Sequence, residues 1–457
     1  MIFDRTSFDR YLSAHRERFL RELAELVAIP SVTAQKRGIQ ECADAVQKRL
    51  EAVDARVQQI PTPNNGSPVV FAEIGQGKRT LLIYDHYDVQ PEDPVELWDS
   101  SPFEVRQENG VLYGRGIADN KGDLMSRIQA LETWQQTQGD LPLKIKFVVE
   151  GEEEIGSVNL HGWVDENKHL LDADGVLWEG ANYDEDGTYR VAQGCKGIAY
   201  LELRTRRGPA YDLHSSRAPM VENPAWRLVW ALSTLKDTND NITLDGYADH
   251  LYKFEDSIYN QVDHLPFEGD KKRELWGLDR WVNDMDDATA RRRYFFEPTL
   301  TICGLESGYT GTGAKTIIPS HAMVKLDFRL VPHLTPELVQ DLLRKHLDRR
   351  GFQDIEIINL GGENPSMLQV GDTAIKRAAL EAYQQGLGLV PVVEPWMRGS
   401  GPIYALSDHI NVPVICAGTL WHPNSRAHAP NENILEKDYF DNMRLVAALI
   451  AAFAANA

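Results

Sequence analysis

The sequence predicts an α/β fold in which a mixed, largely parallel sheet flanked by helices is interrupted by an inserted α+β domain. Three observations predict it. Short apolar runs alternate with helical stretches in the first part of the chain, an apolar-polar alternation begins near Gly194, and the helix-strand alternation returns after about Gly362. Strands that alternate with helices are typical of parallel sheets, whereas apolar-polar alternation is typical of half-exposed strands. At 457 residues, the chain also exceeds what one hydrophobic core usually supports.

The first part of the chain contains the elements of the main sheet. Apolar residues at helical spacing predict two opening helices at residues 8–27 and 39–53, and a further helical stretch at 123–136. Four apolar runs have strand character, at residues 69–74, 80–84, 144–149 and 175–178. Since ligands bind beyond the carboxyl ends of such strands, the residues that follow these runs are the first candidates for a functional site.

The middle of the chain has a different pattern. Residues 198–204 and 322–331 alternate as half-exposed strands do, while residues 237–286 are rich in charge and aromatics and give no clear interpretation. We therefore place an inserted domain at residues 196–366, between two parts of the main domain at 1–195 and 367–457. In the last part we expect a helix at 374–385, a strand at 412–417 and a final helix at 445–455.

Composition excludes several classes of partner. The formal net charge of −20 argues against nucleic acid and anionic membrane surfaces, because proteins that bind them concentrate Lys and Arg on one face. We find no apolar stretch of signal-peptide or membrane-spanning length. The four cysteines are far apart and form no CxxC pair, so we interpret them as buried free thiols and expect a cytoplasmic protein.

His86 and Asp88 follow the strand predicted at 80–84. Two residues apart, they would point to the same side if the strand geometry continues. A ligating imidazole commonly donates its second N–H to a carboxylate, so His86 could bind a metal that Asp88 helps to orient. A surface turn is the alternative for this triplet alone.

Asp119 lies at the turning point of a glycine-punctuated loop that opens a helix, residues 114–122. Its carboxylate could bridge two cations. Alternatively, Asp119 or Asn120 could be a helix N-cap, a role that both side chains fill well. The loop lacks the spacing of the known phosphate-binding glycine motifs.

An acidic cluster, residues 150–154, directly follows the apolar run at 144–149. Ionised carboxylates at the mouth of a buried strand repel one another unless a cation compensates them. A solvated acidic loop is the alternative. If the cluster does bind metal, Glu153 and Glu154 offer a division of labour in which one carboxylate is a ligand and its neighbour accepts a proton from water.

Two more candidates complete a metal-binding shell. Glu179 follows the run at 175–178, and His428 lies in a late polar loop. Together with His86, Asp119 and the acidic cluster, they provide two nitrogen and several oxygen donors, which is the ligand chemistry expected for paired Zn²⁺, with Mn²⁺ or Co²⁺ possible on the same donors.

These motifs, in this order, resemble the co-catalytic dinuclear-zinc metallopeptidase family of aminoacylase, carboxypeptidase G, succinyl-diaminopimelate desuccinylase and the carnosine and cytosolic non-specific dipeptidases. The resemblance covers nearly the whole chain. It implies that His86 and Glu179 hold one metal, that Glu154 and His428 hold the other, and that Asp119 bridges them. It also implies that Asp88 orients His86 and that Glu153 is the general base.

In that family the inserted domain is a lid and a dimerisation surface, so the resemblance implies a homodimer formed through residues 196–366. His214 matches a lid histidine that stabilises the oxyanion, within its own subunit or across the dimer. Arg329 would bind the substrate carboxylate, and further substrate contacts are expected from Thr316, Ser400 and Gly401.

The expected activity is cleavage of an amide or peptide bond in a small substrate with a free carboxylate, most simply a dipeptide. The lid motifs are similar to those of the dipeptidases, whereas Glu179 matches the aminoacylase and carboxypeptidase G branches, so an N-acyl-amino-acid deacylase or a carboxypeptidase G-like hydrolase is the alternative. A dinuclear phosphoesterase and a non-catalytic binding protein are weaker alternatives. The first has little besides Arg115, Lys121 and Arg329 to neutralise a phosphate.

Overall fold

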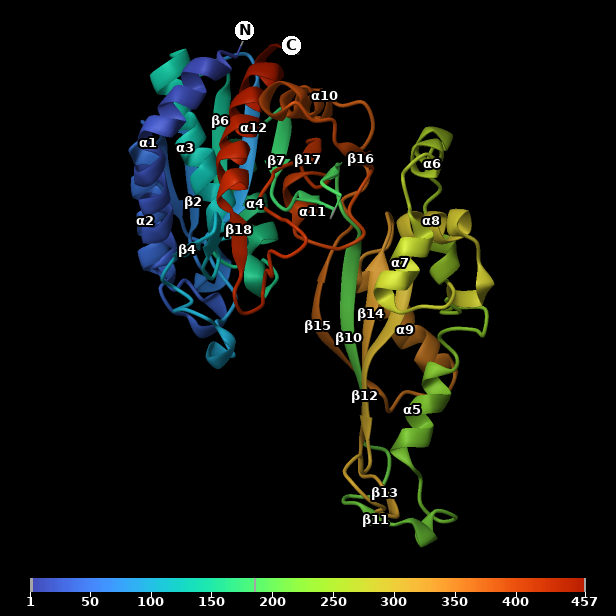
Figure 1. Cartoon of the computed structure of the whole chain (residues 1–457). Coiled ribbons are helices and arrows are strands. Elements are labelled where there is room, and N and C mark those ends of the chain that lie inside the picture. The colour runs from blue at the N-terminus through green and yellow to red at the C-terminus, as the bar shows by residue number, and fades with distance from the viewer. Residues whose placement is uncertain (1–2, 185, 456–457) are drawn as a thin grey trace. The chain divides into compact units, whose positions relative to one another are not determined.

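The structure, a computed structural model, describes residues 3–184 and 186–455. The chain divides into two units, each with its own sheet (Figure 1). Unit 1 comprises Met1–Gly194, Gln369–Pro395 and Pro402–Ala457, and unit 2 comprises Cys195–Leu368 and Trp396–Gly401. The short segment Trp396–Gly401, which the sequence prediction assigns to the main domain, packs with unit 2 instead.

The main sheet of unit 1 has the strand order β1-β2-β6-β3-β7-β17-β9-β16, and β8 pairs with β9. Its central strands β6, β3, β7 and β17 are parallel, whereas β1 and β2 add antiparallel at one side and β9 pairs antiparallel with β17. The strand bounds are β1 Arg56–Ile60, β2 Val69–Ile74, β3 Thr80–His86, β6 Lys144–Glu150, β7 Gly175–Trp178, β8 Asn182–Tyr183, β9 Tyr189–Ala192, β16 Val392–Glu394 and β17 Val414–Cys416.

Helices enclose this sheet because its central strands are apolar on both faces. After their first residue, β3 and β6 are buried throughout, as expected for strands covered on both sides. Helices α1, α3, α12 and α10 pack in that order, each against the next, and α2 packs on β1 and β2 (Figure 1). The helices of unit 1 are α1 Arg5–Val27, α2 Ile39–Glu51, α3 Lys121–Gln138, α4 Leu160–Asn167, α10 Ala374–Ala382, α11 Ile403–Leu406 and α12 Glu436–Ala455. A small sheet is made by β4 Arg106–Glu108, β5 Val111–Tyr113 and β18 Asn433–Leu435.

Unit 2 is built on an antiparallel sheet of order β12-β14-β10-β15. Buried and partly exposed residues alternate along β14, since α5 and α9 pack against this sheet. The strands are β10 Gly197–Thr205, β12 Thr299–Ser307, β14 Ala322–Leu330 and β15 Glu356–Glu363, with a separate pair β11 Leu213–His214 and β13 Ile317–Ile318. The helices are α5 Pro224–Leu232, α6 Asp256–Asp263, α7 Gly269–Trp276, α8 Asp287–Phe296 and α9 Pro336–Arg349.

The predicted fold class is confirmed, with some corrections to individual elements. The final helix begins at Glu436 rather than at residue 445, and the helix predicted at 374–385 ends at Ala382 and continues as a π-helical turn. The four cysteines are free, but Cys303 is exposed on β12 rather than buried. Among the described residues, no helix is both long enough and apolar enough to cross a membrane.

Candidate active site

His86, the last residue of β3, is fully buried. Its Nδ1 atom lies 3.1 Å from the backbone oxygen of Asp88 and 3.4 Å from the Asp88 carboxylate. A proton on Nδ1 satisfies these acceptors and leaves Nε2 free to bind a metal. Nε2 lies 3.0 Å from Asp119 Oδ1 and 3.4 Å from Glu179 Oε2, so the ring faces two carboxylates on the side where a cation would be.

Asp88 has a second task that sequence reasoning did not reveal. Its carboxylate accepts hydrogen bonds from the backbone N–H groups of Glu153 and Glu154, at 3.3 and 3.2 Å. One buried side chain therefore positions both the His86 ring and the turn that follows β6.

The Asp119 loop turns immediately before α3. Asn120 stands at the N-cap of α3, but its side chain makes no capping bond, and its Oδ1 instead accepts the backbone N–H of His86 at 3.3 Å. Asp119 Oδ2 lies 2.9 Å from Nε2 of His428, while its Oδ1 faces His86. The two oxygens of Asp119 thus face two different imidazoles, which is the arrangement expected of a bridging carboxylate.

The acidic cluster at the end of β6 separates into two pairs with different surroundings. Glu150 is buried and accepts hydrogen bonds from Tyr84 and Ser157, and Glu152 accepts one from Asn159. Glu153 and Glu154 begin the short 3-10 helix Glu153–Ile155.

Within the second pair, the Glu154 side chain contacts His428 and Gln90. Glu154 lies 3.2 Å from His428 Nε2 and accepts two hydrogen bonds from Gln90, from its backbone N–H at 3.0 Å and its Nε2 at 2.8 Å.

Two groups of side chains in unit 1 could each hold a metal ion. Their ligand atoms lie within 4.8 Å of one another, and Asp119 belongs to both groups, which are His86, Asp119, Glu179 and Asp119, Glu154, His428. Glu179 Oε2 is buried and has no hydrogen-bond partner among the described residues, so a cation would satisfy it. Nitrogen and carboxylate oxygen donors suit a divalent transition metal. The donors fit such ions, and Glu153 belongs to neither group.

The carboxylates and imidazoles shift one another's pKa values strongly. Burial opposes protonation of His86, but Glu179, Asp119 and Asp88 outweigh it and raise the pKa of this imidazole well above its usual value. Hydrogen bonds to Asp119 and Glu154 raise the pKa of His428 to about 10. Burial, with the repulsion of Asp119 and Glu154, raises the pKa of Glu153 to about 8. Without metal, this cluster therefore binds protons where a cation would lie.

His428 is an unusual position in the loop before β18. Its side chain is 52% exposed, and its backbone adopts the left-handed conformation with φ of 62°. That conformation is uncommon outside glycine and indicates a tightly specified loop. Sequence alone makes such a histidine look like a surface residue, yet the fold brings it to Asp119.

Glu432, four residues after His428, supports the candidate site in a way that the sequence did not predict. Its buried carboxylate accepts hydrogen bonds from Arg115 Nη1 at 2.6 Å and from the backbone N–H groups of Gly116, Ala118 and Asp119 at 2.9, 2.8 and 3.0 Å. It therefore holds the Asp119 loop in place. Lys121, the other loop cation, donates to the backbone oxygens of Leu26 and Ile29, so neither cation of this loop is available to a phosphate.

The predicted substrate residues lie in unit 2. Arg329, on β14, donates to Ser400 Oγ at 3.0 Å and to Asp327 at 3.1 Å, and Ser400 Oγ donates to the Gly197 oxygen. Gly401 accepts from the Cys195 thiol at 3.5 Å through its backbone oxygen.

The exposed His214 and Thr316 lie close together, His214 at the end of β11 and Thr316 just before β13. The backbone N–H of Ser216 donates to His214 Nδ1 at 3.2 Å, and that of Ser215 donates to the Thr316 oxygen at 3.0 Å. An Nδ1 that accepts in this way places the ring proton on Nε2, which makes His214 a hydrogen-bond donor.

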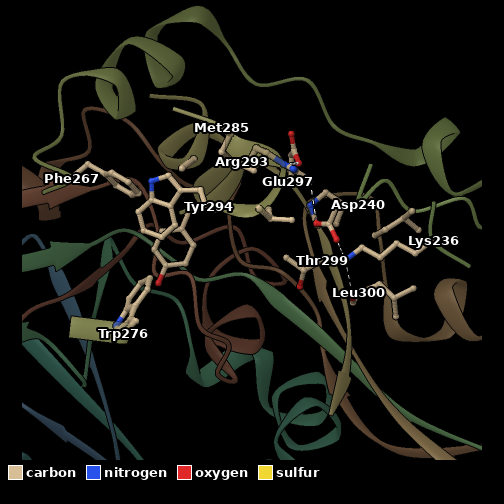
Figure 2. A pocket seen from close by; sticks show the side chains of 15 residues that line it. Lys236, Asp240, Phe267, Trp276, Met285, Arg293, Tyr294, Glu297, Thr299 and Leu300 are labelled. Carbon is tan, nitrogen blue, oxygen red and sulfur yellow. Dashed lines mark hydrogen bonds and ion pairs between the residues drawn. The ribbon is translucent and has the colours of Figure 1, made fainter. Parts of the chain in front are cut away.

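Unit 2 also contains a cavity of about 230 Å³ between α7, α8 and the start of β12 (Figure 2). Aromatic side chains line one part of it, including Phe267, Trp276 and Tyr294. Its charged side chains pair with one another, Lys236 with Asp240 at 2.6 Å and Arg293 with Glu297 at 2.5 Å. None of the predicted site residues lines this cavity.

Residues 82–452 match the sequence profile of peptidase family M20/M25/M40. The chain belongs to this family. The beta-Ala-His dipeptidase of Rattus norvegicus is 27% identical over 466 residues, covering 96% of this chain and 93% of the relative. The Cys-Gly metallodipeptidase dug1 of Schizosaccharomyces pombe is 30% identical over 358 residues, and the match covers 73% of this chain and 73% of the relative. The solved structure of the M20 family metallo-carboxypeptidase Sso-CP2 of Sulfolobus solfataricus superposes with a TM-score of 0.88 at 35% identity, covering 96% of this chain and 99% of that one.

Membership of the M20/M25/M40 family agrees with the two metal-binding groups in unit 1. The protein is a metallopeptidase, as the sequence analysis predicted.

Proposed function

We propose that this protein is a dipeptidase that binds two zinc ions, with His86, Asp119 and Glu179 as ligands of one and Asp119, Glu154 and His428 as ligands of the other. One observation carries the proposal: Asp119 faces a histidine with each of its oxygens, and Glu153 stands beside the two groups without belonging to either. Two dipeptidase relatives support the substrate class.

The division of work among the side chains follows from their surroundings. Bound divalent cations would make a water molecule more acidic and polarise the scissile carbonyl. Glu153 accepts the proton of the attacking water and returns it to the leaving amine, a role that suits a carboxyl group whose pKa is raised by burial. Asp88 keeps the turn that carries Glu153 in register with His86.

The further substrate contacts are proposed from the family resemblance, and their residues belong to unit 2. Arg329 is proposed to bind the substrate carboxylate, because a guanidinium can donate two parallel hydrogen bonds to it. Arg398 and Arg329 are both close enough to Lys196 to lower its pKa, so basic side chains gather around Arg329. Ser400, Gly401 and Thr316 are proposed as further substrate contacts, and His214 as the donor that stabilises the oxyanion.

A substrate panel tests the activity. Ala-Ala, C-terminally amidated Ala-Ala, Ala-Ala-Ala and N-acetyl-Ala would be supplied to protein loaded with Zn²⁺, Mn²⁺ or Co²⁺ in turn. A dipeptidase should cleave Ala-Ala fastest and leave the amidated peptide intact, because Arg329 would lack its carboxylate partner. Equal cleavage of the amidated peptide would contradict the proposed role of Arg329.

A carboxypeptidase is the second candidate, favoured by the 35% identity to a metallo-carboxypeptidase over 96% of this chain. An N-blocked dipeptide separates the two, since a carboxypeptidase cleaves it and a dipeptidase requires a free amine. Preference for N-acetyl-Ala would identify a deacylase instead. A phosphoesterase is less favoured because Arg115 and Lys121 are committed within unit 1.

The first prediction concerns Glu153→Gln. We expect turnover to fall by about 100- to 1,000-fold, because the amide cannot accept a proton from water. Both metals should remain bound, since Glu153 is in neither ligand group. Steady-state kinetics with metal analysis of the same preparation measures both. Near-normal turnover with two metals bound would show that another group is the base.

We further propose a cytoplasmic homodimer formed through unit 2. Four free cysteines support the cellular location. The apolar side chains exposed on the edge strand β12 and on α5 support the dimer, since an unpaired strand edge is a ready site for pairing.

A further inference from the structure

Arg127 lies within α3 and is completely buried. Its Nη1 donates to the backbone oxygen of Tyr84 at 2.7 Å and to Asp85 Oδ1 at 2.8 Å, and its Nη2 donates to the backbone oxygen of Trp178 at 3.0 Å. Tyr84 lies two residues before His86, and Trp178 lies one residue before Glu179. One guanidinium therefore contacts the backbone immediately ahead of two proposed ligands of the same metal.

The position of these contacts in the sheet is informative. The parallel pairing of β3 with β7 runs through Leu81, Leu82 and Ile83 and ends there, before either ligand is reached. Beyond that point, Arg127 hydrogen-bonds to the backbone of both strand ends. The rings of Tyr84 and Trp178 also stack, with centroids 3.6 Å apart.

Burying this charge is costly, which argues for a specific role. The ion pair with Asp85 is fully buried, and Asp85 Oδ2 and Arg127 Nε have no hydrogen-bond partner among the described residues. A buried ion pair of this kind often stabilises a fold less than an apolar pair would. Arg127, unlike an apolar side chain, donates the two hydrogen bonds that join the ends of β3 and β7.

We propose that Arg127 is a positioning residue that sets the spacing between His86 and Glu179 and thereby tunes one of the two metal sites. The inference rests on the proposed function, which assigns these two residues to one metal. The Glu154 and His428 side chains are held by other partners, namely Gln90 and Asp119. Loss of Arg127 should therefore weaken one site selectively.

The test measures the affinity of each successive Co²⁺ ion. Calorimetry and the visible absorption of the bound ion both report it. In Arg127→Met we expect one site to weaken by about 10- to 100-fold, as is usual when the support of a metal ligand is lost, and the other to change by less than about 3-fold. Asp85→Asn should have little effect on either site, because both carbonyl contacts of Arg127 remain. Arg190→Met is the matched control, since Arg190 pairs with Asp184 and Glu394 elsewhere in unit 1.

A double-mutant cycle identifies the affected site. Glu179→Gln should lose the site that His86 and Glu179 form, and adding Arg127→Met should then leave the remaining affinity unchanged. Equal weakening of both sites in Arg127→Met, or an added loss in the double variant, would overturn the inference. If Arg127→Met does not fold by circular dichroism, Arg127→Lys, which can reach only one strand, must show the same selective loss.

The same measurements separate this inference from the proposed function. A wild-type protein that binds fewer than two ions, or cleaves no peptide in the panel, would refute the proposed function. Two bound ions that respond equally to Arg127→Met would refute only the positioning role.

Discussion

Single side chains in this protein hold several partners at once. Asp88 contacts the His86 ring and two backbone N–H groups, and Glu432 accepts four hydrogen bonds around the Asp119 loop. Removing either carboxylate would leave buried donors without acceptors, which costs more than the loss of one average hydrogen bond. The geometry of the proposed metal ligands is therefore set by residues outside the two ligand groups.

Lys196 gives a prediction at the same scale. It is buried, and burial, with the repulsion of Arg398 and Arg329, lowers its pKa to about 7. Between pH 7 and the unfolded value of 10.5, the unfolded chain binds more protons here than the folded one, so stability contributed by this site rises with pH.

Guanidinium denaturation at several pH values checks this. Between pH 7.5 and 9.5, the wild-type protein should gain roughly 2 kcal/mol of unfolding free energy relative to Lys196→Met, as a shift of this size implies. The exposed Lys345→Met is the control and should follow the wild type. Parallel curves for wild type and Lys196→Met would show that Lys196 keeps its ordinary pKa.

At the scale of elements, sequence periodicity predicted the buried strands and the long helices but not the exposed strand β12. β3, β6 and β7 lie where the apolar runs predicted them, because both of their faces are covered. β12 was missed because most of its residues are exposed and no apolar-polar alternation marks it. α12 begins at Glu436, before the apolar run, because its first turns bury polar residues such as Asp438 and Asn442.

The exposed edge of β12 leads to a prediction about assembly. Ile302 on β12 and Trp226 on α5 are 52% and 58% exposed. A charge at either position should dissociate the proposed homodimer, because desolvating it in an interface is unfavourable. Light scattering after size-exclusion chromatography should give twice 51.6 kDa for the wild type and 51.6 kDa for Ile302→Glu and Trp226→Glu.

The control for assembly is Val390→Glu, which alters an equally apolar exposed residue of unit 1 and should remain dimeric. A wild-type protein that is monomeric at all concentrations would rule out the dimer. A dimer that persists in both β12 and α5 variants would place the interface elsewhere.

At the scale of the whole molecule, we expect the two units to differ in their dependence on metal. Both metal-binding groups found among the described residues lie in unit 1. A ligand that binds only the folded form stabilises the unit that contains its site. In differential scanning calorimetry, chelation with EDTA should lower the transition of unit 1 by several degrees and shift that of unit 2 much less. Equal shifts of both transitions would mean that the units unfold together.

The sequence by itself determined the fold class and the residue types that could bind metal, because apolar runs mark the buried strands and carboxylates clustered at their ends are costly unless a cation compensates them. The choice of Glu153 as general base came from the family resemblance and is a proposal. Only the tertiary structure decided which carboxylates face which imidazoles. It separated Glu150 and Glu152 from Glu153 and Glu154, and it revealed Gln90, Arg127 and Glu432. These supporting residues lie up to 317 residues from their partners along the chain. Local sequence patterns cannot predict such contacts, because only tertiary packing creates them.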